Sequence, residues 1–472
     1  MFAVVSSRRP WSRRRYWLGK RGRRLTGHRR VGRRGTGLMV GLFLLSCGLL
    51  VPSAAQAIPT PAQDPFYAYT GANPLSSIAP GTVLNTRTLS YHVAGIPLPI
   101  RTIQLLYRST GQLGQPTVNV TSVLEPLVRG STPNVVAYES LYDSLNPNDE
   151  PSYEIAGGLS LGGIAPAFET LLVAPELLAG DVVVIADTEG ETADFADGPE
   201  YGMYTLDSLR AAIASPLTNL SHTKKIGILG YSGGAIGAEW AAVMAPTYAP
   251  DINHLLVGSA MGGVLVDPDH NLYYVNGSTE WAGILPMAVI GVARSFHVNL
   301  TQYLTAYGLQ LYNKLQTASI LNVLDQYSGL TMQDLILPQD LPPESIPIFP
   351  QVVNQLIMGA HGTPTAPLFI GQGGGPTEDG TVGDQPGIGI GDGVMVTGDV
   401  RALASEYCQR GVTVQYNQYG LDHIASAAAW LVQALPWLSN RFAGQPAPQD
   451  CSTIAPGNSL APVVLGVSPI TP

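Results

Sequence analysis

The chain has 472 residues, which is longer than a single hydrophobic core usually grows, so one large domain with an insertion, or two domains, is expected. Hydrophobic residues make up 45% and charged residues only 12%, a balance that excludes a disordered chain or a coiled coil. The formal net charge of −9 is unevenly distributed. Residues 1–57 hold 13 of the 25 Lys and Arg and no acid, so the remainder carries a charge of −22, which disfavours binding to nucleic acid.

The first 57 residues have the order of a secretory signal. An arginine-rich stretch, residues 1–36, precedes the apolar run Gly37–Val51 and a small-x-small tripeptide, which predicts cleavage after Ala57. The apolar run is short for a membrane-spanning helix, although a membrane anchor remains an alternative. Lipoprotein anchoring at Cys47 is a lesser alternative, and the twin-arginine-like segment Ser12–Leu18 leaves the export route open. Each route predicts a secreted protein or one associated with the cell envelope.

The cysteine count agrees with export. Of three cysteines, cleavage after Ala57 leaves Cys408 and Cys451. An even number in an oxidising compartment predicts that these two form a disulfide, with two separate buried thiols as the alternative. The closed loop would contribute roughly 3–4 kcal/mol to stability.

Taken in chain order, the mature sequence alternates between strand and helix patterns. Residues 58–80 are rich in Pro, Ala and Ser and predict an extended leader, and residues 81–125 are strand-like, with an antiparallel hairpin over 101–108 and 118–124. Continuous β-branched runs then predict buried parallel strands, and the segments between them predict helices. The further strands are expected at 134–138, 181–186, 224–229, 254–258, 366–370 and 412–416, and helices at 204–214, 235–244 and 424–441.

This alternation predicts an α/β fold with a mostly parallel central sheet. It breaks between about 262 and 362, where Trp, Tyr and Leu recur at helical spacing without a clear strand. We therefore predict a helical cap inserted at 262–362, between a first core part at 81–261 and a second at 363–472 that includes the C-terminal tail.

The strongest chemical motif is Gly230-Tyr-Ser232-Gly233-Gly234, which follows a predicted strand and precedes a helix rich in small residues. A serine on a sharp strand-to-helix turn is the nucleophile elbow of α/β-hydrolases, and glycines two residues before and after it avoid steric collision. Ser232 is therefore the predicted nucleophile, and the Gly233 amide is the natural first oxyanion donor. A purely structural glycine turn is the alternative.

Ser232 requires a base, and in α/β-hydrolase order the base follows the last strand. Only His423 fits this position, because it stands after the strand expected at 412–416 and before the final helix. The other histidines of the mature chain are His92, His222, His254, His270, His297 and His361.

The acid is expected on the long glycine-rich loop after the strand at 366–370. Asp392 is preferred because it stands just before the helix expected around 398–408, with Asp384 and Asp379 as alternatives and Glu378 also present. The acids that are not used are expected in a solvated loop, with a weak calcium site as a remote alternative. We predict no metal and no cofactor.

Several further motifs lie outside the segment Gly230–Gly234. They are Leu105–Ser109, Tyr142–Ser144, Ala238–Ala241, Gly391–Val394, Glu406–Gly411, Asp422-His423 and Arg441–Pro448. With the elbow, they resemble the secretory lipase family, the α/β-hydrolases of the lipase A type, over roughly residues 65–445.

The resemblance implies Ser232, Asp392 and His423 as nucleophile, acid and base. It also implies that Asp143 and the Gly233 amide form the oxyanion hole, that the Cys408–Cys451 pair braces the C-terminal segment, and that the helical cap covers an acyl-binding tunnel. The chain departs from the family pattern in the insertion of glycines and acids between the strand and Asp392.

These observations predict a secreted serine hydrolase of carboxylic esters, in particular a triacylglycerol lipase, acting through an acyl-enzyme on lipid or ester substrates. A monomer with transient contact to a lipid interface is expected. A serine peptidase or acyltransferase with the same triad, or a non-catalytic exported binding protein, remains an alternative. The apolar stretch Trp281–Val292 would line an acyl tunnel, face lipid, or form an ordinary buried helix.

Overall fold

The computed structural model describes residues 58–375, 380, 381 and 383–470, all within one compact unit, Ala57–Pro472. The predictions for the export signal, for Cys47 and for Glu378 and Asp379 lie outside the described residues.

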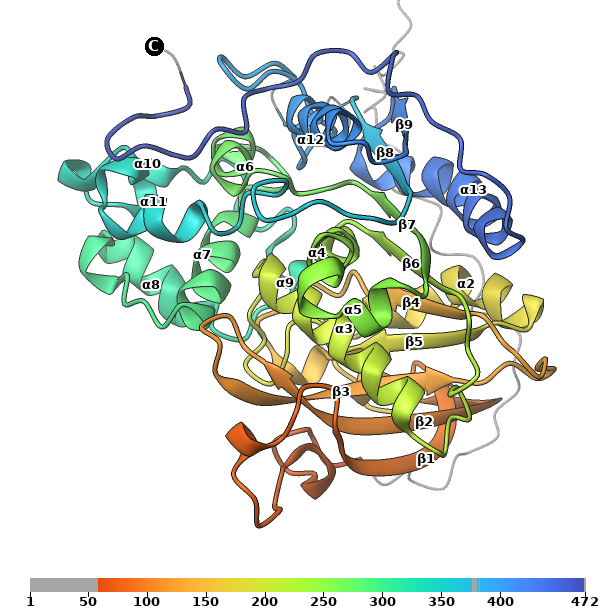
Figure 1. The fold of residues 1–472 in the computed structure, drawn as a ribbon. Helices are drawn as coiled ribbons and strands as arrows, with labels where there is room; N and C mark the ends of the chain where they lie inside the picture. The colour runs from red at the N-terminus through yellow and green to blue at the C-terminus, as the bar shows by residue number, and fades with distance from the viewer. Residues whose placement is uncertain (1–57, 376–379, 382, 471–472) are drawn as a thin grey trace, which may run out of the picture. The chain divides into compact units, whose positions relative to one another are not determined.

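A mixed sheet organises the unit (Figure 1). Among the described residues it has nine strands in the order β1-β2-β3-β5-β4-β6-β7-β8-β9. The first three strands and β5 pair antiparallel, whereas the pairs from β5 to β9 are parallel, so the prediction of a mostly parallel α/β sheet entered by a hairpin is confirmed. The strands are β1 Val83–Val93, β2 Ile96–Thr110, β3 Pro116–Leu124, β4 Val135–Glu139, β5 Val182–Ala186, β6 Ile226–Tyr231, β7 Leu256–Gly262, β8 Leu368–Gly373 and β9 Val414–Tyr419.

Helices pack on both faces of this sheet. Alternate residues of β4 point to opposite faces: Val135 and Ala137 join a core with α3, α4 and α12, while Val136 and Tyr138 join a second core with α2 and α13. Burial on both faces explains why these strands are continuous apolar runs. The helices are α1 Pro151–Ile155, α2 Ile164–Ala179, α3 Gly198–Ala214, α4 Gly233–Tyr248, α5 Pro250–Asn253, α6 Pro268–Val275, α7 Ile284–Ser295, α8 Ala306–Lys314, α9 Ile320–Val323, α10 Met332–Leu335, α11 Ile348–Val353, α12 Thr397–Gln409 and α13 His423–Phe442.

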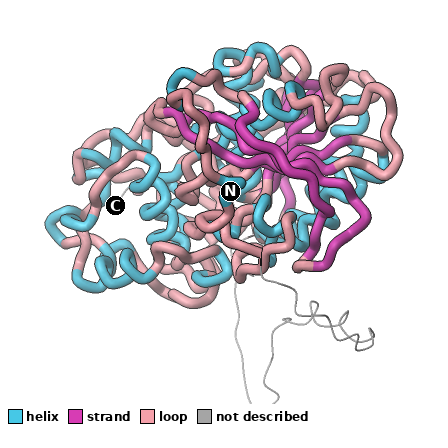
Figure 2. The backbone as a smooth tube through the Cα atoms, turned by 90° about the horizontal axis from the view of Figure 1, so that it is seen from below, coloured by secondary structure: helices cyan, strands magenta, loops and turns pink. Residues whose placement is uncertain are grey.

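Residues 263–367, all of them described, connect β7 to β8 and contain α6 to α11 but no strand. We call this segment the helical region. Figure 2 shows the strands gathered on one side of the unit, while the side formed by the helical region is drawn as helix and loop. It has a hydrophobic core of its own, to which Phe195 and Val394–Val396, outside this region, also contribute. The domain limits predicted at 262 and 362 remain predictions.

Several predicted boundaries were wrong by a few residues. The last strand begins at Val414 and runs to Tyr419, beyond the predicted 412–416, and β7 extends to Gly262. Helix α3 begins at Gly198, six residues before the prediction, because Pro199 and Glu200 suit a first helical turn. Strand β1 lies within the stretch 81–125 that is predicted to be strand-like, whereas no prediction covered α1 or α2.

The predicted disulfide is confirmed. Cys408, near the end of α12, is bonded to Cys451 with an S–S distance of 2.06 Å and a Cα–Cα distance of 5.6 Å. The bond ties α12 to the segment that follows α13. Within the described part of the chain, no helix has both the length and the apolar character needed to span a membrane.

Candidate active site

Ser232 stands between β6 and α4 in a strained conformation, with φ 56° and ψ −123°. A non-glycine residue with positive φ persists only where its surroundings hold it. The two flanking glycines are required by packing: a Cβ on Gly230 would lie 2.2 Å from the Gly234 carbonyl oxygen, and one on Gly234 would lie 2.1 Å from that of Glu139. The local geometry is therefore a strained strand-to-helix turn of the kind that the motif predicts, and its role as a nucleophile elbow stays a prediction.

His423 is the first residue of α13 and is buried beside this serine. Its Nε2 lies 2.8 Å from the Ser232 Oγ, and its Nδ1 lies 2.9 Å from the Asp392 Oδ2. The three side chains thus form one continuous chain of hydrogen bonds, although they are separated by 191 and 31 positions in the sequence.

Asp392 is completely buried, and neighbouring groups fix its carboxylate. Oδ1 accepts hydrogen bonds from the backbone amides of Val394 and Met395, at 3.2 and 2.8 Å. Oδ2, which faces His423, also accepts one from the Gln372 Nε2 at 2.8 Å. Asp384 is exposed on the same loop and is not brought to the histidine, so of the described candidates only Asp392 has this geometry.

Two aromatic rings hold the imidazole. Tyr231, directly before the serine, donates a hydrogen bond to the His423 carbonyl at 2.6 Å, and its ring centroid lies 5.3 Å from the imidazole. Trp281, from the helical region, meets the imidazole edge-on at 5.5 Å. Neither residue was predicted to contact the imidazole, because no local signal predicts which rings pack against a distant histidine.

Asp143 follows β4 and lies against the elbow. Its carboxyl occupies the space beside Gly233: a Cβ on that glycine would lie 1.8 Å from the Asp143 Oδ1. Burial raises the pKa of Asp143 to about 7, despite the opposing effect of His423. A carboxyl with such a pKa is partly protonated near neutral pH and is then able to donate a hydrogen bond.

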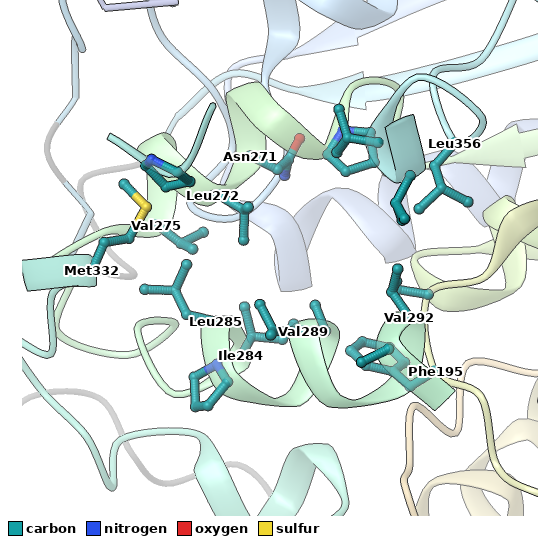
Figure 3. A pocket seen from close by; sticks show the side chains of 18 of the residues that line it. Phe195, Asn271, Leu272, Val275, Ile284, Leu285, Val289, Val292, Met332 and Leu356 are labelled. Carbon is teal, nitrogen blue, oxygen red and sulfur yellow. The ribbon is translucent and has the colours of Figure 1, made fainter. Parts of the chain in front are cut away.

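Residues of this site and of the helical region line a cavity of about 210 Å³, and Figure 3 shows part of its wall. Ser232, Gly233 and Asp143 are among the residues that line it, and its walls are almost entirely apolar. Figure 3 shows Ile284, Leu285, Val289 and Val292 of α7 along one side. The stretch Trp281–Val292 therefore lines the cavity. Further lining residues are Phe195, Leu272, Val275, Met332, Leu335, Phe349 and Leu356.

The described residues contain no group of three or more His, Cys, Asp and Glu arranged to hold a metal ion. The polar groups that meet at this site are a hydroxyl, an imidazole, carboxyls and backbone amides.

Comparison with known proteins identifies the family. The family model described as secretory lipase matches residues 157–375. A Mycobacterium tuberculosis protein named "Probable inactive lipase" is 30% identical over 398 residues, which cover 82% of this chain and 83% of that protein. Lipase A of Arthroderma benhamiae is 30% identical over 450 residues, 89% of each chain. The chain belongs to the secretory lipase family.

The same family relationship is seen in three dimensions. The crystal structure of Candida antarctica lipase A in its closed state matches with a TM-score of 0.70 and 25% sequence identity, covering 86% of this chain and 91% of that one. The resemblance inferred from motifs and the α/β-hydrolase fold are thereby confirmed. Membership of a secretory family agrees with export from the cell, and lipids or other esters are the substrates that the family implies.

Proposed function

We propose that this protein is a secreted serine hydrolase of carboxylic esters, with triacylglycerols as its substrate class. The observation that carries the proposal is the hydrogen-bonded chain Ser232–His423–Asp392, whose serine lines an apolar cavity. A hydroxyl is a poor nucleophile near neutral pH, and an adjacent imidazole oriented by a carboxylate is the usual means of activating it.

In the proposed reaction, the His423 Nε2 takes the proton of the Ser232 hydroxyl while the oxygen attacks the ester carbonyl. The tetrahedral intermediate collapses, and the protonated imidazole gives its proton to the leaving alcohol. Water, activated by the same imidazole, then attacks the acyl-enzyme and releases the fatty acid. Asp392 holds the ring in position and stabilises the imidazolium.

The developing oxyanion would be bound by the backbone amide of Gly233 and by Asp143. The Gly233 amide is at the start of α4, where free amides and the helix dipole favour negative charge. In its protonated form the Asp143 carboxyl supplies the second donor, because it lies directly against Gly233.

The cavity supports an acyl-chain substrate. Its walls offer alkyl and aromatic side chains and few hydrogen-bonding groups, so an aliphatic chain gains free energy by leaving water for this surface. In this proposal the helical region is a cap over an acyl-binding tunnel. A monomer that contacts the lipid interface only transiently completes the proposal.

One relative gives reason to consider a second function, because it is named "Probable inactive lipase". A non-catalytic exported binding protein would keep the cavity but would hydrolyse no ester. Peptidase or acyltransferase activity with the same three residues is distinguished by amide cleavage, or by acyl transfer to an alcohol acceptor in preference to water.

The test is Ser232→Ala, assayed on soluble short-chain and emulsified long-chain esters. We expect a loss of at least about 10³-fold in kcat, with little change in melting temperature. The exposed Ser221→Ala is the matched control and should retain full activity. Undiminished hydrolysis by Ser232→Ala would contradict the catalytic proposal, and absence of hydrolysis by the unmodified protein would favour the binding protein.

Export is proposed to remove residues 1–57. N-terminal sequencing of protein recovered from the medium should then begin at Ile58. A chain that begins at an acylated Cys47 would instead support lipoprotein anchoring.

A further inference from the structure

The loop that carries Asp143 is held in a conformation it would not adopt alone. Asp143 has φ 39°, in the left-handed region that non-glycine residues rarely occupy. The free-energy cost of that conformation has to be offset by contacts on either side of the residue.

On the side of the sheet, Glu189 contacts both neighbours of Asp143. It follows β5, and only 1% of its surface is exposed. Its carboxyl accepts the Ser144 N–H, at 3.0 Å from Oε1 and 3.1 Å from Oε2. Its own backbone N–H donates to the Tyr142 hydroxyl at 2.7 Å. Tyr201 donates to the Glu189 Oε1 at 3.2 Å and so fixes the carboxyl in turn.

On the other side, the helical region binds the backbone of the same loop. The Ile320 N–H donates to the Asp143 carbonyl, and the Leu145 N–H donates to the Ala318 carbonyl, both at 2.8 Å. Arg294 of α7 donates to the Leu145 carbonyl at 3.1 Å. The loop is therefore held from two sides, and the Ser144 N–H, which points to the sheet side, depends on Glu189.

We propose that Glu189 is a positioning residue for oxyanion stabilisation. By accepting the hydrogen bond of the Ser144 amide, Glu189 fixes the Asp143 carboxyl against Gly233, where the substrate oxyanion forms. This role rests on the proposed ester hydrolysis. Glu189 touches no reacting atom and acts only through Asp143. Without its carboxyl, the completely buried Ser144 N–H has no acceptor, and the loop is expected to turn until that amide finds one.

Glutamine is a close substitute for Glu189 in size and reach. Burial raises the pKa of Glu189 well above its usual range, and the nearby Asp143 carboxyl raises it further. A neutral glutamine retains a carbonyl oxygen of the same reach for the Ser144 N–H. Aspartate retains a carboxyl but is one methylene shorter, so it does not reach that amide without movement of the backbone.

The experiment compares the full-length mature variants Glu189→Ala, Glu189→Asp and Glu189→Gln, alone and combined with Asp143→Ala. We expect kcat to fall on the order of 10–100-fold in the alanine and aspartate variants, with KM unchanged, because displacing one oxyanion donor costs somewhat less than removing it. In the glutamine variant, kcat should fall only a few-fold. In the Asp143→Ala background, the Glu189 substitutions should lower kcat by less than about twofold, since coupled residues are not additive.

The acid limb of the kcat/KM pH profile, which reports the base, should not move in any Glu189 variant. Glu239→Gln is the matched control: Glu239 is a completely buried glutamate of α4 that accepts from the Tyr407 hydroxyl, and its substitution should change the melting temperature rather than kcat. If Glu189→Ala does not fold, the aspartate and glutamine variants carry the test.

Two results would overturn the proposal. One is a kcat loss that adds fully to that of Asp143→Ala, which indicates a general structural role. The other is full activity in both the alanine and aspartate variants. Neither result would contradict the proposed ester hydrolysis. That proposal is contradicted separately, by retained activity in Ser232→Ala.

Discussion

Two histidine–aspartate pairs in the described part of the chain are built alike. In the first, the His423 Nδ1 lies 2.9 Å from the Asp392 Oδ2, and the Gln372 amide donates to that same oxygen at 2.8 Å. In the second, the His270 Nδ1 lies 2.9 Å from the Asp399 Oδ1, which also accepts from the Asn458 amide at 2.7 Å. Both aspartates are at most 1% exposed.

The surroundings of the two imidazoles differ. His423 has the strained Ser232 hydroxyl at its second nitrogen and two aromatic rings against its faces. His270 instead has a further acid, Asp267, 3.8 Å from its Nδ1. Burial lowers the pKa of His270, but the hydrogen bond and charge of Asp399 and the charge of Asp267 outweigh this effect and raise the pKa to about 9.

With a pKa of about 9, the imidazole of the second pair is protonated near neutral pH, and its ion pair with Asp399 joins α6 to α12. A catalytic base must instead be unprotonated so that it can accept a proton. A histidine–aspartate contact with an amide to support it is thus no sign of catalysis by itself. The serine on its strained turn and the apolar cavity distinguish the first pair.

The largest expected effect is a difference in kcat between variants of the two aspartates. Asp392→Asn should lower kcat by about 10⁴-fold, because an asparagine favours the wrong tautomer of the imidazole. Asp399→Asn should leave kcat within about twofold and lower the melting temperature. Steady-state kinetics with a soluble ester measure both, and equal losses in the two variants would contradict the distinction between the pairs.

The next largest effect on kcat is expected at Asp143, the proposed oxyanion donor beside the first pair. Asp143→Ala should lower kcat by about 10²–10³-fold at unchanged KM. Asp143→Asn keeps an N–H donor and should retain much more activity. Because deprotonation abolishes donation by Asp143, wild-type kcat should fall as the pH rises through about 7, and this alkaline limb should be absent in Asp143→Asn. An identical limb in both proteins would show that Asp143 does not donate from its carboxyl.

A smaller effect tests the amides that support each aspartate. Gln372→Leu removes a donor to a buried carboxylate and should reduce kcat on the order of tenfold. Asn458→Leu removes the equivalent donor from the second pair and should leave kcat unchanged. A comparable loss in Asn458→Leu would mean that the second pair supports turnover after all.

The smallest effect on turnover, and a defined effect on stability, is expected at His270. The folded state raises its pKa from 6.5 to about 9, which corresponds to roughly 3 kcal/mol of stabilisation when the imidazole is protonated. This contribution is complete below about pH 6.5, declines as the pH rises and is lost above about pH 9. Denaturant unfolding of wild type and His270→Gln across this interval should show the difference narrowing with pH, and a constant difference would contradict it.

Much of the fold and part of the site could be predicted because their signals are local. Ser232 is marked by glycines that the turn requires, and His423 by its place after the last strand and before the final helix. Asp392 was one of several acids on its loop, and the structure places it beside His423, although its catalytic role stays a prediction.

The remaining features depend on contacts between distant segments. Asp143 was inferred only from the family resemblance, because neither its positive φ nor its contact with Gly233 leaves a local signal. The contact of Glu189 with the Asp143 loop and the contact of Trp281 with the imidazole could not be predicted, since both form only once β5, the helical region and the elbow are assembled. The boundary error at β9 arises in the same way, because pairing with β8 extends the strand to Tyr419. The start of α3, by contrast, has a local signal in Pro199 and Glu200 that the prediction did not use.

Reaction with a fluorophosphonate ester, followed by peptide mass spectrometry, addresses the reactivity of the serine most directly. We expect one equivalent of label per chain, located on Ser232, at a rate that falls steeply in His423→Ala. A wild-type protein that stays unlabelled, or carries its label on another residue, would contradict the proposed nucleophile.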